Sequence, residues 1–319
     1  MTRHIPVLLE EVREGMHLQN GMTVVDATLG GGGHASMMLA EIVPTGRVIA
    51  LDMDQEALDR FEKRIASEES LRQAAADGRL VLVQSNYSEV ASTLDTLGVK
   101  SVDGVLADLG YSSDQIESAG RGFSFQENGP LDMRLNQKTG RTARDIVNTA
   151  TPAELLRILR EYGDEVEAKR IVQAISDHRK IAPIETTHDL AELVAEAYPK
   201  RKRALSKIHP ATKTFQALRI AVNEEFEHLD VFLGQAVERL VSGGRLAVIT
   251  FHSGEDMRVK HFMKAQSTGC VCPPNFPVCR CDQKSRVKIL TKRPIIAGPD
   301  EVMVNPRARS AKLRILEKL

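Results

Sequence analysis

The residues best suited to chemistry form a glycine-rich loop with an acid on either side. Four glycines, residues 30–33, follow an apolar run that ends at Asp26, and a second apolar run ends at Asp52. The dinucleotide-binding pattern G-x-G-x-x-G/A is matched by Gly30, Gly32 and Ala35. An acid about twenty residues after such a loop suits the hydroxyls of a ribose. The alternative is a turn that only lets a helix pack closely on a strand. The two acids favour a nucleotide-like ligand.

Asp26 distinguishes between two cofactors. Its position at the carboxyl end of the first strand is where a dinucleotide places its pyrophosphate, and a carboxylate there repels phosphate. S-Adenosylmethionine carries no phosphate, offers an ammonium and a sulfonium to acids, and presents one carboxylate to a helix N-terminus. The sequence therefore favours S-adenosylmethionine over NAD.

Two further candidates follow later apolar runs. Asp108 stands near the end of the run 102–109, where a reactive methyl group would point, and an acid there could accept a hydrogen bond from an amine. A role restricted to cofactor binding is equally open for it. His252 follows the run 245–251 and could take up a proton, or it could only orient its loop. Both are candidate catalytic residues.

The elements that must position these residues are those of a parallel α/β sheet. Apolar runs at 22–28, 47–52, 79–83 and 102–109 alternate with helical patterns such as 55–67, and a fifth run comes only at 245–251. A terminal strand pair is predicted at 287–291 and 311–316. This is the class I, Rossmann-like, seven-stranded methyltransferase arrangement. A dehydrogenase would continue with another βα unit.

A helical insertion separates the fourth and fifth strands. Helices are predicted at 153–162, 164–178 and 187–197, and the chain then returns through an amphipathic helix from about Thr214 to Leu240, stopped by Gly243 and Gly244. We assign residues 1–115 and 214–319 to a cofactor-binding domain, and residues 116–213 to an inserted all-helical domain that recognises substrate.

The composition is that of a globular protein. The 319 residues suffice for two domains, and the 43 basic and 43 acidic residues cancel. No apolar run reaches the roughly 18 residues of a membrane span, so we expect a cytoplasmic protein without membrane contact. Four cysteines lie close together in the sequence: Cys270, Cys272, Cys279 and Cys281. They could bind zinc, form a disulfide or stay reduced in a surface loop, and we assign them no metal.

Clusters of basic residues offer phosphate contacts, although such runs are commonly only solvated faces. One cluster closes the insertion and the other lies near the C-terminus. The candidate RNA-binding residues are Lys200, Arg201, Lys202, Arg203, Lys207, Lys213, Arg307 and Arg309.

Seven spaced motifs, in matching order, make the chain resemble the MraW/RsmH family of bacterial methyltransferases. They are HIPVLLEEV (4–12), DLGYSS (108–113), RGFSF (121–125), GPLDMR (129–134), HPATKTFQALR (209–219), FHSGED (251–256) and NPRARS (305–310). The resemblance implies methylation of N4 of a decoding-centre cytidine in 16S rRNA of the small (30S) ribosomal subunit, with the target base single-stranded or splayed out.

The same resemblance implies the residues that contact S-adenosylmethionine. These are Gly32, Gly33, His34, Asp52, Tyr87, Asp108 and Gln115. Two functions of other classes stay open from the residues: an NAD-dependent oxidoreductase and a non-catalytic RNA-binding factor in ribosome assembly. The sequence also leaves the oligomeric state open, a homodimer included.

Overall fold

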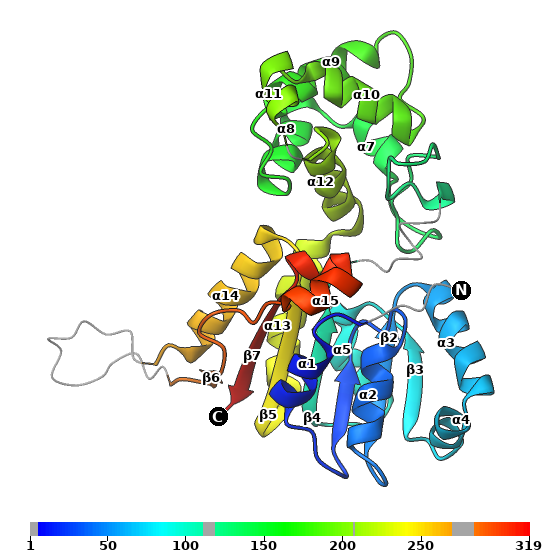
Figure 1. Cartoon of the computed structure of the whole chain (residues 1–319), viewed down its shortest axis with the longest axis vertical. Coiled ribbons are helices and arrows are strands. Elements are labelled where there is room, and N and C mark those ends of the chain that lie inside the picture. Colours follow the sequence, from blue (N-terminus) through cyan, green and yellow to red (C-terminus); the bar gives the residue numbers. More distant parts are fainter. Residues whose placement is uncertain (1–5, 111–118, 207, 270–283) are drawn as a thin grey trace, which may run out of the picture. The chain divides into compact units, whose positions relative to one another are not determined.

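A computed structural model describes residues 6–110, 119–206, 208–269 and 284–319. The chain divides into two compact units (Figure 1). Residues Met1–Gly110 and Glu227–Leu319 form one, here called the sheet domain. Residues Tyr111–Phe226 form the other, here called the insertion.

A seven-stranded sheet is the centre of the sheet domain, in the order β3-β2-β1-β4-β5-β7-β6. Its strands are β1 (Thr23–Asp26), β2 (Arg47–Asp52), β3 (Leu80–Gln84), β4 (Val102–Asp108), β5 (Leu240–Thr250), β6 (Val287–Ile289) and β7 (Lys312–Lys318). The first five strands run parallel, whereas β7 is antiparallel to both β5 and β6. This order confirms the predicted class I fold.

Helices cover both faces of the sheet because successive residues of each strand point to opposite sides. Val24 belongs to the core beneath one helical layer, and Val25 to the core beneath the other. The first layer contains α1 (Leu9–Met16), α2 (Gly33–Glu41), α3 (Gln55–Ser67) and α4 (Glu69–Ala76). The second contains α5 (Val90–Thr96), α13 (Glu225–Arg239) and α14 (Ser253–Ser267). A short helix, α15 (Pro299–Val304), precedes β7.

The insertion is built from helices around a core of its own. They are α7 (Ala143–Thr149), α8 (Pro152–Glu161), α9 (Ala168–His178), α10 (Thr187–Ala197), α11 (Lys200–Leu205) and α12 (Ala211–Asn223). Thr142 and Thr186 form capping boxes that start α7 and α10, and Thr151 followed by Pro152 starts α8 as predicted. In the described part of the insertion, strand-like pairing is limited to a bridge between Pro130 and Thr186.

The return to the sheet domain differs from the single helix that we expected from Thr214 to about Leu240. Helix α12 ends at Asn223, Glu224 adopts a left-handed conformation with φ 49°, and α13 then runs to Arg239. Phe215 lies in the core of the insertion, so α12 packs there. Residues 243 and 244 lie within β5 rather than ending a helix. A left-handed break is usually made by glycine or asparagine, so the sequence gives no signal at Glu224.

Candidate active site

Three acids gather at the carboxyl edge of the sheet. Asp26, Asp52 and Asp108 are the last residues of β1, β2 and β4, which are neighbouring parallel strands. Asp26 is only 1% exposed, and the other two are partly buried. Ligands of open α/β sheets bind at this edge, and the topology brings to it three residues that the sequence predicted as site residues.

The turn after β1 ties the three acids together. The Thr28 N–H donates to Asp26 Oδ1 (3.2 Å), and Thr28 Oγ1 accepts from the Asp108 N–H (2.6 Å). The Gly30 N–H donates to Asp52 Oδ2 (2.9 Å). Sequence reasoning missed Thr28, although a threonine two residues after a strand-ending acid is a recognisable place for such a turn.

Two oxygens of these acids keep their acceptor capacity. Within the described ranges, Asp26 Oδ2 and Asp108 Oδ1 are buried and accept no hydrogen bond. Burial raises the pKa of Asp26 well above its usual value, and the nearby charges of Asp108 and Asp52 raise it further. Burial also raises the pKa of Asp52 to about 6 and that of Asp108 to about 7. A cation bound at this edge would stabilise the carboxylate forms.

Two glycines of the loop lie so close to neighbouring rings that a side chain would not fit, and another is held by its backbone conformation. Gly30 and Gly32 have φ values of 49° and 70°, which glycine adopts without strain. A Cβ on Gly32 would lie 2.0 Å from the Phe61 ring, and one on Gly33 would lie 2.8 Å from the Pro6 ring. Gly33 begins α2, whose first-turn N–H groups suit an anion.

His34 and Tyr87 lie on elements that border this edge. His34, in the first turn of α2, is 5% exposed, and its Nε2 lies 3.9 Å from Asp108 Oδ2. Tyr87 follows β3, where its ring packs edge-on against Phe232 of α13, with centroids 5.4 Å apart. Both positions agree with the sequence placement, but their cofactor contacts stay predictions.

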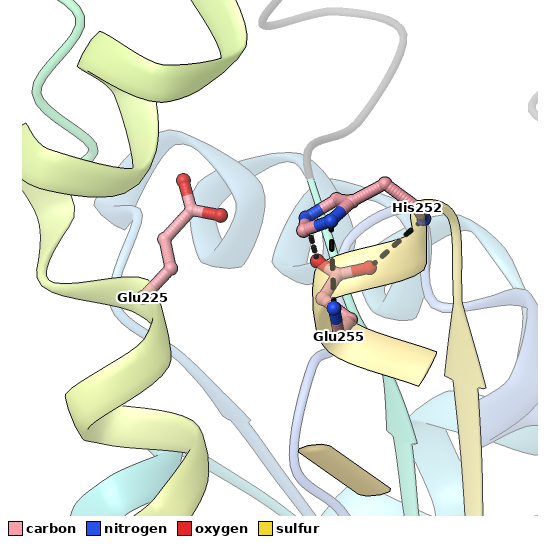
Figure 2. A group of neighbouring side chains, drawn as sticks. All are labelled: Glu225, His252 and Glu255. Carbon is pink, nitrogen blue, oxygen red and sulfur yellow. Dashed lines mark hydrogen bonds and ion pairs between the residues drawn. The ribbon is translucent and has the colours of Figure 1, made fainter. Parts of the chain in front are cut away.

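His252 caps α14 and is held by Glu255 (Figure 2). Its Nδ1 accepts from the Glu255 N–H (3.4 Å), and its Nε2 lies 3.0 Å from Glu255 Oε1. Glu255 Oε2 also accepts from the Phe251 N–H (2.8 Å). The capping box uses Nδ1 of the ring, and a ring held through its cap fits the loop-orienting role. Glu255, missed from the sequence, occupies the N3 position where capping boxes carry an acid.

The two C-terminal arginines predicted to bind RNA have different surroundings. Both lie in the 3₁₀ turn η3 (Pro306–Ser310), where Arg307 is half-buried and Arg309 is exposed. The positive charge of Arg307 acts on Asp108 and lowers its pKa, opposing the larger effect of burial. Arg307 therefore borders the acidic edge of the sheet, which its position in the sequence did not suggest.

The basic residues of the insertion also differ among themselves. Lys202 Nζ lies 2.5 Å from Glu167 Oε1, and Lys213 Nζ donates to the Asp164 carbonyl (2.9 Å). The other basic residues of α11 are exposed: Lys200, Arg201 and Arg203. Several predicted residues lie outside the described ranges: Gln115, Lys207, Cys270, Cys272, Cys279 and Cys281.

Comparisons with known proteins identify relatives along the whole chain. The family described as the MraW methylase family matches residues 1–319. Ribosomal RNA small subunit methyltransferase H of Geobacter sp. (strain M21) is 45% identical over 99% of this chain and 98% of its own length. The protein of that name from Pelobacter propionicus is 47% identical over 99% of each chain.

Solved structures are more distant. An rRNA methylase from Streptococcus thermophilus is 11% identical with a TM-score of 0.39, covering 98% of this chain and 93% of that one. A SAM-dependent O-methyltransferase from Thermotoga maritima is 9% identical with a TM-score of 0.42, covering 98% and 64%. None of the helices in the described ranges is long and apolar enough to cross a membrane.

The raised pKa of Asp108 predicts that Asp108→Asn stabilises the protein at alkaline pH. A carboxyl with a pKa of 3.8 unfolded and about 7 folded opposes folding increasingly as pH rises between those values. The variant should gain up to about 4 kcal/mol at pH 8 and almost nothing at pH 4, as measured by urea unfolding. The exposed Asp59→Asn serves as control. A gain of equal size at both pH values, or a loss at pH 8, would contradict the prediction.

Proposed function

This chain belongs to the MraW methylase family, and from that membership we propose that it methylates N4 of a decoding-centre cytidine in 16S rRNA. The relatives named ribosomal RNA small subunit methyltransferase H support RNA of the small subunit as substrate, and we propose the assembled 30S particle as its form. A ribosomal substrate would place the reaction in the cytoplasm. Membership in a methylase family removes the NAD-dependent oxidoreductase from consideration.

S-Adenosylmethionine is the methyl donor, and the residues at the sheet edge fit it. Asp26 Oδ2 and Asp108 Oδ1 are buried acceptors that no described group satisfies, which suits a ligand with an ammonium and a sulfonium. Asp52 keeps lone pairs beyond those used by the N–H groups of Gly30 and Asp54, so it can accept from ribose hydroxyls. Gly33 begins α2, whose first-turn N–H groups suit the carboxylate of the cofactor. When bound, this cofactor supplies an electrophilic methyl group on a sulfonium.

Asp108 is the residue that we propose to act on the substrate amine. The exocyclic amine of cytosine is a weak nucleophile because its lone pair is conjugated with the ring. The Asp108 carboxylate can accept a hydrogen bond from one amine N–H and so orient the remaining lone pair. As the nitrogen–carbon bond forms and the sulfur–carbon bond breaks, the nitrogen becomes acidic. Asp108, with a pKa of about 7, can take that proton and release it to solvent.

The insertion supplies surface features that suit single-stranded RNA. Lys200 and Arg201 of α11 are exposed cations that can contact phosphates. A cavity of about 290 Å³ is lined by Tyr198, Lys202, Leu205, His209 and Lys213, among other residues. Aromatic and apolar groups near exposed cations, here Lys200 and Arg201, are the combination that contacts bases and phosphates of unpaired strands. We therefore assign RNA recognition to the insertion.

Replacing Asp108 should abolish methyl transfer without preventing cofactor binding entirely. With labelled S-adenosylmethionine and 30S subunits, Asp108→Asn should lower kcat at least 100-fold, because the amide is a poor acceptor and no base. Calorimetric titration with S-adenosylmethionine separates this loss from loss of binding. Near-normal turnover would remove Asp108 from catalysis, and binding of 30S subunits with no transfer by the unsubstituted protein would instead favour an assembly factor.

The exposed cations of α11 should affect substrate affinity more than turnover. Lys200→Gln combined with Arg201→Gln should raise the KM for 30S subunits several-fold and leave kcat nearly unchanged, because phosphate contacts bind ground and transition states alike. The salt dependence of binding should weaken correspondingly. Lys180→Gln, an exposed lysine elsewhere on the insertion, serves as control. An unchanged KM and salt slope would exclude this surface from RNA binding.

A further inference from the structure

The strand register brings the segment before β7 to the same edge as Asp108. In the ladder, Asp108 of β4 pairs with Ile249 of β5, which pairs with Leu313 of β7. Because β7 runs antiparallel, the residues that precede Lys312 lie at the carboxyl edge of β4 and β5. The segment reaches this edge at β7, which is two strands away from β4 and Asp108. Neighbouring strands are about 4.8 Å apart.

Local contacts hold Arg307 in this segment. The buried Asn305 accepts from the Arg307 N–H through its Oδ1 (3.3 Å), and its own N–H donates to the Glu301 carbonyl (2.7 Å). Ala308 within the turn and Ala311 directly after it are buried. These contacts fix the backbone of Arg307 in the sheet domain.

The charged groups around Asp108 come from four elements. Asp26 ends β1, His34 lies on α2 with its Nε2 3.9 Å away, Glu255 lies on α14, and Arg307 lies in η3. The carboxyl groups of Asp26 and Glu255 disfavour the ionised form of Asp108, whereas the guanidinium of Arg307 favours it.

The other cations at the start of β7 are already engaged. Arg314 Nε lies 2.6 Å from Asp256 Oδ1, and Lys312 Nζ lies 3.5 Å from Asp256 Oδ2. Arg307, by contrast, is a cation whose charge acts on Asp108.

We propose that Arg307 is a positioning residue that favours the carboxylate form of Asp108 near neutral pH, and so increases the fraction of molecules able to accept a hydrogen bond from the substrate amine. This proposal rests on the proposed role of Asp108. It replaces the RNA-phosphate contact that the sequence suggested for Arg307, and it leaves Arg309 as a candidate RNA contact.

The effect would be large at working pH because Asp108 titrates there. Its pKa lies at about 7, so roughly half of the molecules carry the carboxylate at pH 7. A rise of one unit on removal of Arg307 would reduce that fraction to about one tenth. Arg307→Lys keeps a positive charge and should restore most of the ionised fraction, whereas Arg307→Gln should not.

Two measurements on the whole protein test the proposal. The first is ¹³C NMR titration of aspartate-labelled protein without RNA, with the Asp108 signal assigned through Asp108→Asn. The second is the pH dependence of kcat and KM with 30S subunits. Arg307→Gln should raise the apparent pKa of Asp108 by about one unit and move the acid limb of kcat to higher pH by the same amount. The control is Arg293→Gln, an exposed arginine in the loop between β6 and α15, which should change neither.

The outcomes separate this proposal from the proposed function. An unmoved Asp108 titration in Arg307→Gln overturns the proposal, and a raised KM with an unmoved titration assigns Arg307 to RNA instead. If the titration moves but the kcat profile does not, Arg307 still controls the ionisation of Asp108, and it is the catalytic role of Asp108 that fails. Full recovery of both readouts in Arg307→Lys supports the proposal.

Discussion

Burial of three carboxylates at one edge of a parallel sheet is the constraint on which this site depends. The strand order brings Asp26, Asp52 and Asp108 together, and burial favours the protonated form of each. The turn at residues 28–30 offsets part of that cost by donating backbone N–H groups to two of them. The remaining acceptor capacity suits a cationic ligand, such as the sulfonium cofactor that we propose binds at this edge.

The same constraint explains why distant parts of the sequence meet at this edge. Strands β1, β2 and β4 contribute the acids, whereas His252, Glu255 and Arg307 come from segments that follow the insertion. The sheet continues from β4 to β5 although the insertion lies between them in the sequence. An inserted domain can thus carry substrate recognition without disturbing the register that places Asp108 beside β5.

The sequence predicted the sheet and the acidic edge because both depend on strong local patterns. Residues 47–52 and 55–67 have the predicted bounds, since an apolar β-branched run and an apolar stripe at helical spacing leave little ambiguity. The break at Glu224 left no signal, because an acid in a left-handed conformation is determined by packing rather than by propensity.

The long-range features of the site were the least predictable. The sequence grouped Arg307 with Arg309 by charge, and only the register of β7 against β5 places it near Asp108. Likewise, Lys202 looked like part of a free basic run, yet it pairs with Glu167, thirty-five residues earlier. Pairings of this kind depend on tertiary structure, which local sequence patterns do not encode.

Nucleoside analysis of the reaction product tests the central claim most directly. After incubation with 30S subunits and S-adenosylmethionine carrying a labelled methyl group, 16S rRNA would be digested to nucleosides and analysed by mass spectrometry. We expect the label on N4 of cytidine, at a single decoding-centre site, because we propose from the family membership that this amine is the target and that Asp108 accepts its hydrogen bond. Label on a ring carbon, on a ribose oxygen or on another base would contradict it.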